Sequence, residues 1–411
     1  MYQIDQRMSK KIIAILCLIA IIISTSGCTD ILDTSKSSSN IQVGQNIELE
    51  VIEQEENTSK SQPENVKIED EKDDKSEEIQ NLVPYNGAVQ HIFFHPLIAY
   101  PELAFDGDAK ERGFNDYFVT IQEFERIIQS LYEKNYILID INMLIQEKKE
   151  GDKTKIERST LMIPEGKKPL IISIDDMNYY DYMRENGTIY KLILDDEGNI
   201  ATYSIAPDGE EKIAYDNEII PLLDKFVESH TDFSLDGTKG VIALTGFEGV
   251  LGYRTNEIDS PNYQKEKESA LAVIEKLKEN GWTFASHGYG HRDAAKISLK
   301  KLIADTNKWR DEVGSLVGPT KVYIYPYGSR VLPGDSKFQA LVDAGFNILC
   351  AVGSQAYEKL DTNALMQDRR HIDGIGLIQQ RERFLDLFDS YKIIDYNARP
   401  DKYIQGIKGE L

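Results

Sequence analysis

Residues 269–291 have the sequence SALAVIEKLKENGWTFASHGYGH, which places a helix, a stop, a strand and a candidate site in that order. The helix Ser269–Lys278 stops at Asn280-Gly281 and leads into the apolar run Trp282–Ala285, a short strand. Two glycines interrupt the segment that follows, and each costs a helix interior about 1 kcal/mol relative to alanine. We therefore place His287 and His291 in a turn at the end of a strand.

The same order of helix, stop and strand recurs along the chain. Helix Ser298–Val313 leads into Val322–Tyr325, and helix Ser336–Ala344 leads into Phe346–Val352. A capping-box pattern starts a further helix at Thr120. The remaining predicted elements are the strands Val89–Phe94, Tyr136–Ile139, Pro169–Ile174 and Val241–Leu244, and the helix Glu218–His230. Alternation of this kind predicts parallel pairing, in an α/β barrel or a doubly wound sheet.

One region interrupts the alternation. Two hairpin signals, Asp196-Glu197-Gly198-Asn199 and Pro207-Asp208-Gly209, lie between short β-type runs. We predict that residues 186–216 form a β-hairpin insertion above the mouth of the barrel, with a role that the sequence leaves open.

Composition limits the class of protein. The formal net charge of −22 argues against nucleic-acid binding, which needs a basic surface. The chain has three cysteines, two of them near the N-terminus, so no disulfide framework is expected. Cys350 lies in an apolar strand and is expected in the core. We expect a monomer.

The N-terminus has the features of an export signal. A basic start and the short apolar run Ile12–Ile23 precede Thr25-Ser26-Gly27-Cys28, which is similar to a bacterial lipoprotein cleavage site. Residues 1–27 are then a signal peptide, and Cys28 is the lipidated residue of an extracytoplasmic protein anchored to the cell membrane. An ordinary secretory signal is the alternative. Residues 28–84 are acidic and contain no aromatic residue, so we predict a disordered tether.

Two adjacent carboxylates complete the candidate site. Asp175 and Asp176 follow the apolar run Ile171–Ile174, and strand ends of one barrel meet at the same face. Two imidazoles and one carboxylate suit Zn²⁺ or another divalent transition metal, with a position left open for chemistry. A polar surface turn for His287 and His291, and a solvated strand end for the aspartates, are the alternatives.

These residues resemble the polysaccharide deacetylase superfamily, the chitin- and peptidoglycan-deacetylase-like carbohydrate esterases. Three motifs occur in the family's order: Ser173-Ile174-Asp175-Asp176, His287-x-x-x-His291 and Pro326-Tyr327-Gly328. The resemblance covers roughly residues 86–395, and so we divide the chain into a barrel at 85–395 and a C-terminal tail at 396–411. It implies a distorted (β/α) barrel, a divalent metal, usually zinc, and hydrolysis of N-acetyl groups on amino sugars.

The resemblance also implies roles for single residues. Asp175 would be the general base, and Asp176, His287 and His291 the metal ligands. The backbone N–H of Tyr327 would help to hold the oxyanion. The chain departs from the family at Gly288, where a hydroxyl residue is usual, and at Ile324, where many members have an arginine. Arg254 is a candidate replacement for that arginine, with a surface ion pair as the alternative.

The general acid has two candidates. In the late strand Arg369–Asp373, alternate side chains share a face, so Asp373 could orient His371. The family's acid is a late-strand histidine, which favours His371; His95, at the end of the first strand, is the rival. Tyr179, with Tyr180 and Tyr182, could stack on a sugar ring, or simply pack in the core.

Together these features predict a metal-dependent hydrolase that removes N-acetyl groups from a cell-surface or extracellular amino-sugar polysaccharide. Two rival functions remain. One is a glycan-binding lipoprotein of the same fold without turnover, and the other is a metal-dependent amidase acting on another C–N bond. The sequence does not name the glycan or the metal.

Overall fold

The computed structural model describes residues 81–151 and 153–408, which all belong to one unit of the chain, Ser76–Leu411. The predicted signal peptide, Cys28 and all but the end of the predicted tether lie outside the described residues, and those interpretations stay predictions. Within the described ranges, no helix combines the length and apolarity needed to cross a bilayer.

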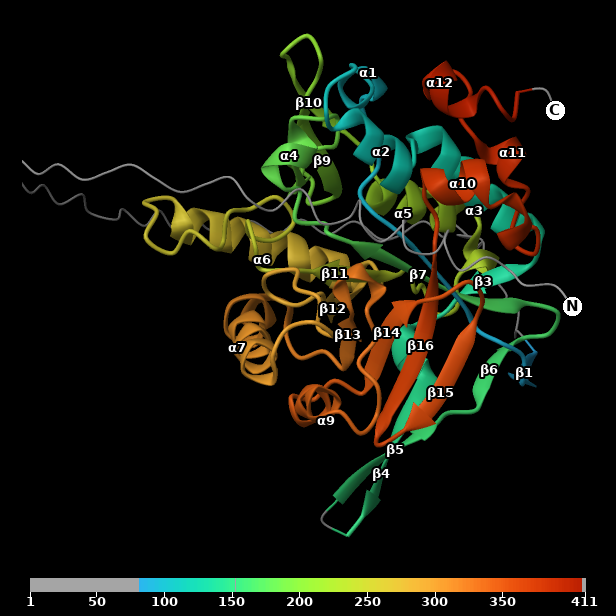
Figure 1. Ribbon diagram of the computed structural model, residues 1–411, viewed down its shortest axis with the longest axis vertical. Helices are drawn as coiled ribbons and strands as arrows, with labels where there is room; N and C mark the ends of the chain where they lie inside the picture. The colour runs from blue at the N-terminus through green and yellow to red at the C-terminus, as the bar shows by residue number, and fades with distance from the viewer. Residues whose placement is uncertain (1–80, 152, 409–411) are drawn as a thin grey trace, which may run out of the picture. The chain divides into compact units, whose positions relative to one another are not determined.

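Seven parallel strands close into a ring, which confirms the distorted (β/α) barrel (Figure 1). In order around the ring they are β7 (Lys168–Asp175), β11 (Val241–Leu244), β12 (Thr283–Ser286), β13 (Val322–Ile324), β14 (Ile348–Val352), β16 (Ala364–His371) and β2 (Gln90–Phe94). The pairing is weakest between β12 and β13, which meet through Ser286 and Tyr323 alone. This thin seam is one source of the barrel's distortion.

Helices alternate with the ring strands, as the sequence predicts. The α-helices are α1 (Pro101–Ala104), α2 (Glu111–Tyr117), α3 (Ile121–Glu133), α4 (Asp181–Arg184), α5 (Ile219–Ser229), α6 (Tyr263–Glu279), α7 (Leu299–Trp309), α8 (Ser315–Val317), α9 (Ser336–Asp343), α10 (Gly374–Gln379), α11 (Ser390–Ile393) and α12 (Asp401–Ile404). The capping box of α3 is present in both directions, between Thr120 and Glu123. Helix α6 begins six residues before the predicted Ser269, because its charged first turns carry no apolar period.

Several strands lie outside the ring. They are β3 (Tyr136–Leu138), which extends the sheet beside β7, β15 (Tyr357–Asp361), antiparallel to β16, the hairpin β4 (Ile145–Glu150) and β5 (Lys153–Arg158), and the pair β1 (Leu82–Tyr85) and β6 (Leu161–Pro164). Only β3 among these was predicted. The β4–β5 hairpin is largely charged, so it lacks the alternation that marks a half-buried strand. Strand β1 also corrects the predicted tether, which ends before Leu82 rather than at residue 84.

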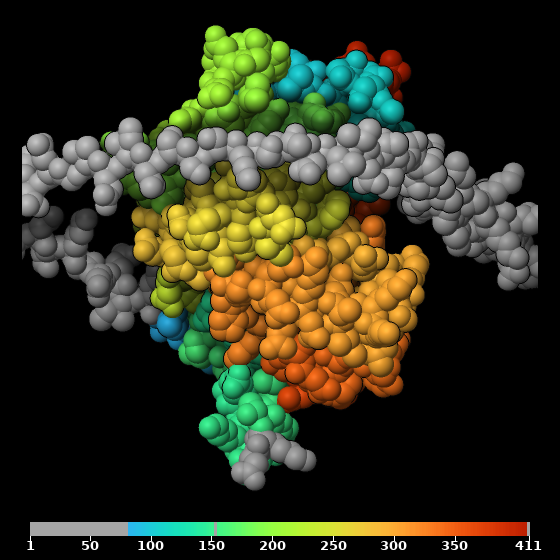
Figure 2. Space-filling view, turned by 90° about the vertical axis from the view of Figure 1, so that its left-hand side faces the viewer, coloured from blue at the N-terminus to red at the C-terminus, as the bar shows by residue number. Residues whose placement is uncertain are grey.

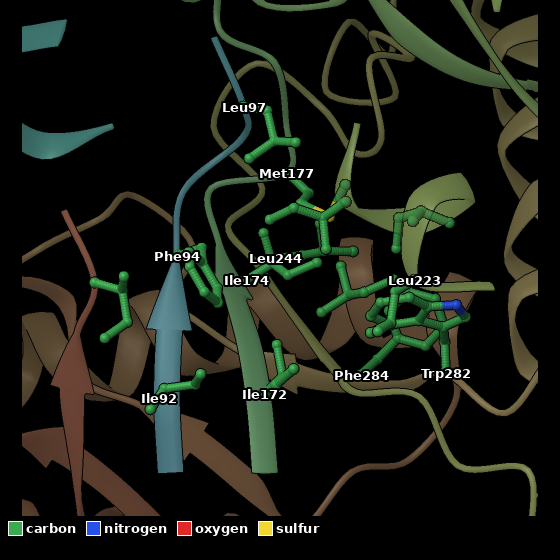
Figure 3. Packing of buried hydrophobic residues seen from close by; sticks show 14 of the residues in the cluster. Ile92, Phe94, Leu97, Ile172, Ile174, Met177, Leu223, Leu244, Trp282 and Phe284 are labelled. Carbon is green, nitrogen blue, oxygen red and sulfur yellow. The ribbon is translucent and has the colours of Figure 1, made fainter. Parts of the chain in front are cut away.

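Alternate residues of the ring strands face two different cores. Ile172 and Ile174 of β7 point outward and join the large cluster beneath the helices, which Figure 3 shows together with Ile92 and Phe94 of β2. Ile171 points inward, into a second cluster that fills the lower barrel and includes Cys350, as predicted. The period-two rule therefore sends Ser173 and Asp175 into the barrel as well.

The insertion is a three-stranded antiparallel sheet of β8 (Lys191–Leu194), β9 (Ile200–Ile205) and β10 (Glu211–Ala214), which confirms the predicted β insertion. It projects from the opposite end of the molecule to the β4–β5 hairpin (Figure 2). Leu192 and Ile200 are buried in the large cluster, so the insertion is part of the domain and not an appendage.

The barrel domain does not stop at residue 395. Arg399 is buried and forms an ion pair with Glu123, with Nε 2.6 Å from Oε1. Ile404 is also fully buried. The segment separated as a C-terminal tail from the sequence therefore packs on the barrel domain through residue 407.

Candidate active site

The predicted site residues gather at the carboxyl ends of the ring strands. Asp175 ends β7, His287 follows β12 and His371 ends β16. His95 follows β2, and Tyr327 follows β13. One end of the barrel thus receives a polar side chain from each of five strands, as the sequence predicts.

Asp176, His287 and His291 form a cluster that could hold a metal ion. One ligand atom from each lies within 4.8 Å of the others. His291 Nε2 is 3.6 Å from Asp176 Oδ2, near the spacing of about 3.4 Å between two donors on a tetrahedral zinc ion. His287 Nδ1 lies 2.9 Å from the carbonyl oxygen of Ile324, so Nδ1 carries the proton and Nε2 keeps its lone pair for a metal. The donor set and its geometry therefore fit zinc.

The loop that carries both histidines is shaped by a residue that sequence reasoning missed. Asp305, on α7, accepts hydrogen bonds from the backbone N–H groups of Tyr289, at 2.7 Å, and Gly290, at 3.0 Å. Gly288 has a φ of 65°, and a Cβ there would lie 3.0 Å from Asp305 Oδ2. The glycine that departs from the family pattern thus makes room for this carboxylate.

Asp175 is held by Arg369 in the barrel interior. The guanidinium donates from Nη1 to Oδ1 at 2.7 Å and from Nη2 to Oδ2 at 2.9 Å, and both side chains are buried. Burial would raise the pKa of the Asp175 carboxyl, but Arg369 and then His287 outweigh it and hold that pKa well below its usual range. Asp175 is therefore an ionised carboxylate beside the metal cluster, with Oδ2 3.8 Å from His287 Nε2.

Arg254 does not contact Asp175, so the hypothesis that Arg254 replaces the arginine expected at position 324 is wrong. Its guanidinium pairs with Asp181 and donates to the carbonyl oxygen of Glu248, so the ion-pair alternative is confirmed. The arginine that pairs with Asp175 is Arg369. The sequence placed Arg369 on the same face as His371 without showing what it contacts.

A buried polar layer supports Arg369 from below. Its Nη1 also donates to Ser173 Oγ at 3.1 Å, and Ser173 Oγ lies 2.9 Å from His91 Nε2. His91 Nδ1 contacts Gln367 Oε1 at 2.7 Å. Burial, and then Arg369, lowers the pKa of His91 to about 3, so this imidazole is neutral. Nothing in the local sequence marked His91, because its partners come from two other strands.

His371 is oriented as the sequence proposes. Its Nδ1 lies 2.8 Å from Asp373 Oδ2, and its ring stacks on Phe93 with centroids 4.3 Å apart. Its Nε2 is 3.2 Å from His95 Nδ1, and His95 Nε2 is 3.9 Å from Asp176 Oδ2. Burial, and then His371, lowers the pKa of His95 to about 4. His95 thus lies beside Asp176 and His371 lies beside His95, but of the two only His371 has a carboxylate within hydrogen-bond distance.

Tyr180 is a further contact that the sequence did not assign. Its hydroxyl donates to Asp176 Oδ1 at 2.8 Å and shares a hydrogen bond with Thr245 Oγ1, also at 2.8 Å. Groups that fix an oxygen of a ligand carboxylate leave the other oxygen aimed at the metal. Tyr180 therefore positions Asp176 with Oδ2 toward the histidines.

Tyr179 cannot stack on a sugar, and its assignment to substrate is wrong. Its side chain is fully buried below the site, whereas three other aromatic rings around the site are exposed. We call these the aromatic rim: Tyr182 (40% exposed), Phe247 (53%) and Tyr327 (69%). Tyr182 and Phe247 lie 6.0 and 5.8 Å from the ring of Tyr180, and Tyr327 lies 4.7 Å from the ring of His291.

The second half of this site matches a known family. Residues 256–349 fit the family model described as polysaccharide deacetylase. This segment is similar to the polysaccharide deacetylases. It holds His287, His291 and Tyr327, whereas Asp175 and Asp176 precede it. The match supports a carbohydrate deacetylase. No curated protein matches the chain.

Three solved structures of deacetylases align weakly with this chain. A Bacillus anthracis protein assigned to the polysaccharide deacetylases is 16% identical, and the alignment covers 70% of this chain and 65% of that one. The deacetylase PplD of Streptococcus pyogenes, in complex with acetate, is 13% identical, with 72% and 98% covered. A de-N-acetylase of Aggregatibacter actinomycetemcomitans is 13% identical, with 70% and 96% covered. All three have a TM-score of 0.40, which marks a weak likeness.

Proposed function

We propose that this protein is a metal-dependent hydrolase that removes N-acetyl groups from an amino-sugar polysaccharide. One observation carries the proposal: the convergence of Asp176, His287 and His291 beside a separate, ionised carboxylate, Asp175. Metal-catalysed amide hydrolysis needs a set of metal ligands and, beside it, a carboxylate that does not bind the metal.

The metal would be held by Asp176, His287 and His291. When bound, zinc would polarise the acetyl carbonyl and make water acidic enough to ionise near neutral pH. Asp175 accepts the proton of the attacking water, and Arg369 keeps that carboxylate ionised and fixed. His371, whose Nδ1 faces Asp373, is the proposed source of the proton for the departing amine, and its Nε2 lies 3.2 Å from His95 Nδ1. The backbone N–H of Tyr327 would help to hold the oxyanion, as the family resemblance implies.

The aromatic rim supports a carbohydrate as the substrate. Exposed aromatic side chains bind ligands that present an apolar face and a polar edge, and a pyranose ring has both. All three rings are exposed; Tyr327 lies beside His291, and the other two lie beside Tyr180, which donates to Asp176. A small acyl amide without a sugar would leave these rings unused, which favours the deacetylase over an amidase for another C–N bond.

The proposal includes a location. The N-terminal signal and Cys28 support an extracytoplasmic protein tethered to the membrane by lipid, which would act on a cell-surface or extracellular glycan.

The decisive experiment measures acetate release from a panel of N-acetylated glycans, together with the metal content of the purified protein. Near-stoichiometric zinc and acetate release that a chelator abolishes are expected. A glycan-binding protein without turnover would bind glycan and release no acetate. An amidase of another class would release product from a non-carbohydrate amide and leave the glycans intact.

A further inference from the structure

A cavity of about 300 Å³ lies beside the barrel mouth, outside the metal cluster. One wall comes from α4 and the insertion, and the other from the segment that links β11 to α6 and from the first turns of α6. Its main lining residues are Arg184, Tyr190, Lys191, Tyr203, Arg254 and Glu266.

Close backbone contacts hold the two walls in place. Leu192 N–H of the insertion donates to the carbonyl oxygen of Leu251 at 3.1 Å. Gly252 has a φ of 93°, and a Cβ there would lie only 2.3 Å from Lys191 Cβ and 2.4 Å from the carbonyl oxygen of Tyr190. Arg184 also donates to the carbonyl oxygen of Gly252. The cavity is therefore formed before any ligand arrives, which lowers the entropic cost of binding.

The lining selects one class of ligand. The rings of Tyr190 and Tyr203 stand at 87° with centroids 6.3 Å apart, and Arg184 and Lys191 each lie over one of them. Around them are the cations Arg184, Lys191 and Arg254, and across from them the carboxylates Glu257 and Glu266. Charges of both signs disfavour an apolar ligand and any strongly charged ligand. They suit a neutral molecule with many hydroxyl and amide groups, which can both donate and accept.

Lys191 has the freest polar group in the cavity. Its ammonium lies 5.3 Å from the ring centre of Tyr203 and 5.4 Å from that of Tyr253. No carboxylate in the described ranges, 81–151 and 153–408, lies within ion-pair distance of it. A ligand oxygen in the cavity would therefore meet an ammonium group that contacts two rings and no carboxylate of the described ranges.

The cavity adjoins the aromatic rim. Arg254 pairs with Asp181, which precedes Tyr182, and its Nη2 lies 3.8 Å from the carboxylate of Glu248, which follows Phe247. A chain molecule that lies on the rim with one unit at the metal cluster would reach the cavity with a later unit.

We propose that this cavity is a distal subsite that binds another sugar residue of the same N-acetylated polysaccharide. The inference rests on the proposed function and assigns part of its specificity to the insertion. An enzyme with such a subsite prefers longer oligomers, because binding energy is gained away from the reacting acetyl group.

The test compares a tetramer and a dimer of β-linked N-acetylglucosamine, by titration calorimetry and by acetate release. Lys191→Met keeps the alkyl stem and removes the ammonium. Asn262→Ala removes another lining amide, and this side chain makes no hydrogen bond at the start of α6. Lys212→Met is the matched control, since Lys212 lies on the same insertion and pairs with Glu210 outside the cavity.

Each cavity variant is expected to raise the dissociation constant of the tetramer about tenfold. For Lys191 this corresponds to the loss of one hydrogen bond from a charged group, and for Asn262, whose amide is neutral, it is an upper limit. Dimer binding and the Lys212→Met variant should be unchanged. Equal tetramer affinity in wild type and both cavity variants, or equal losses for tetramer and dimer, would overturn the subsite. Because calorimetry needs no turnover, tetramer binding that depends on Lys191 without acetate release would support the subsite and refute the proposed function.

Discussion

The ion pair between Arg369 and Asp175 allows a prediction whose size follows from the structure. Both side chains are almost fully buried, at 1% and 4% exposure, and they share two hydrogen bonds of 2.7 and 2.9 Å. Removing one partner of a buried pair leaves the other charge without compensation, which costs about 3–5 kcal/mol. We expect Arg369→Met to lower the free energy of unfolding at pH 7 by that amount, a large part of the roughly 5–15 kcal/mol that a typical domain has.

The double-mutant cycle separates this pair from general damage to the core. Asp175→Asn alone leaves Arg369 unpaired and should also destabilise the protein. In the double variant neither charge remains, so its loss should be smaller than the sum of the two single losses by at least about 2 kcal/mol. Urea unfolding of the four proteins measures this coupling. If the two losses added to within about 0.5 kcal/mol, the pair would not be coupled and the reasoning would fail.

The sign of the pH dependence is a second check on the same pair. In the wild type Arg369 lowers the pKa of Asp175, so this carboxylate stabilises the fold above its unfolded pKa of about 3.9, and the contribution is lost as the pH falls below that value. Without Arg369, burial dominates and raises the pKa of Asp175. The stability loss in Arg369→Met should therefore be largest near pH 8 and shrink toward pH 5, where the carboxyl can take up a proton. A loss that grew toward pH 5 would contradict the assignment.

Four further predictions concern single residues. Asp176→Ala removes one of three metal ligands, so metal content by mass spectrometry should collapse, whereas a still-stoichiometric metal would place the site elsewhere. His371→Ala should lower turnover by about 10²–10⁴-fold with metal retained, and His95→Ala should cost less; the reverse order in steady-state rates would assign the acid to His95. Glu218 is fully buried, and burial raises its pKa to about 8. Stability should therefore fall by roughly 1.4 kcal/mol per pH unit as the pH rises between about 5 and 8, and Glu218→Gln should flatten this slope in thermal unfolding; an unchanged slope would contradict it. Maturation should leave a diacylglyceryl group on Cys28, and mass spectrometry that finds cleavage elsewhere or an unmodified residue would refute the anchor.

The order of elements and the meeting of Asp176, His287 and His291 could be predicted from the sequence, because both depend on local patterns. A helix stop such as Asn280-Gly281 and the apolar run after it mark a strand whatever else the chain does. Parallel strands end at one face of a barrel, so Asp176, His287 and His291 had to meet once the alternation was recognised. The two-residue period of side chains along a strand predicted that His371 and Asp373 share a face, and in the structure His371 Nδ1 lies 2.8 Å from Asp373 Oδ2.

The sequence could not determine the contacts between strands and helices that lie far apart in the chain. Arg369 reaches Asp175 across the barrel, 194 residues away, and Asp305 reaches the histidine loop from a helix. Tyr179 and Tyr182 carry the same local signal, yet one is buried and the other exposed. Local propensity sets which elements form, but the closure of the ring alone decides which interior side chains face one another. The partners, the burial and therefore the pKa of a side chain depend on the tertiary structure. For this reason only the structure showed what Arg369 and Asp305 contact and which rings form the aromatic rim.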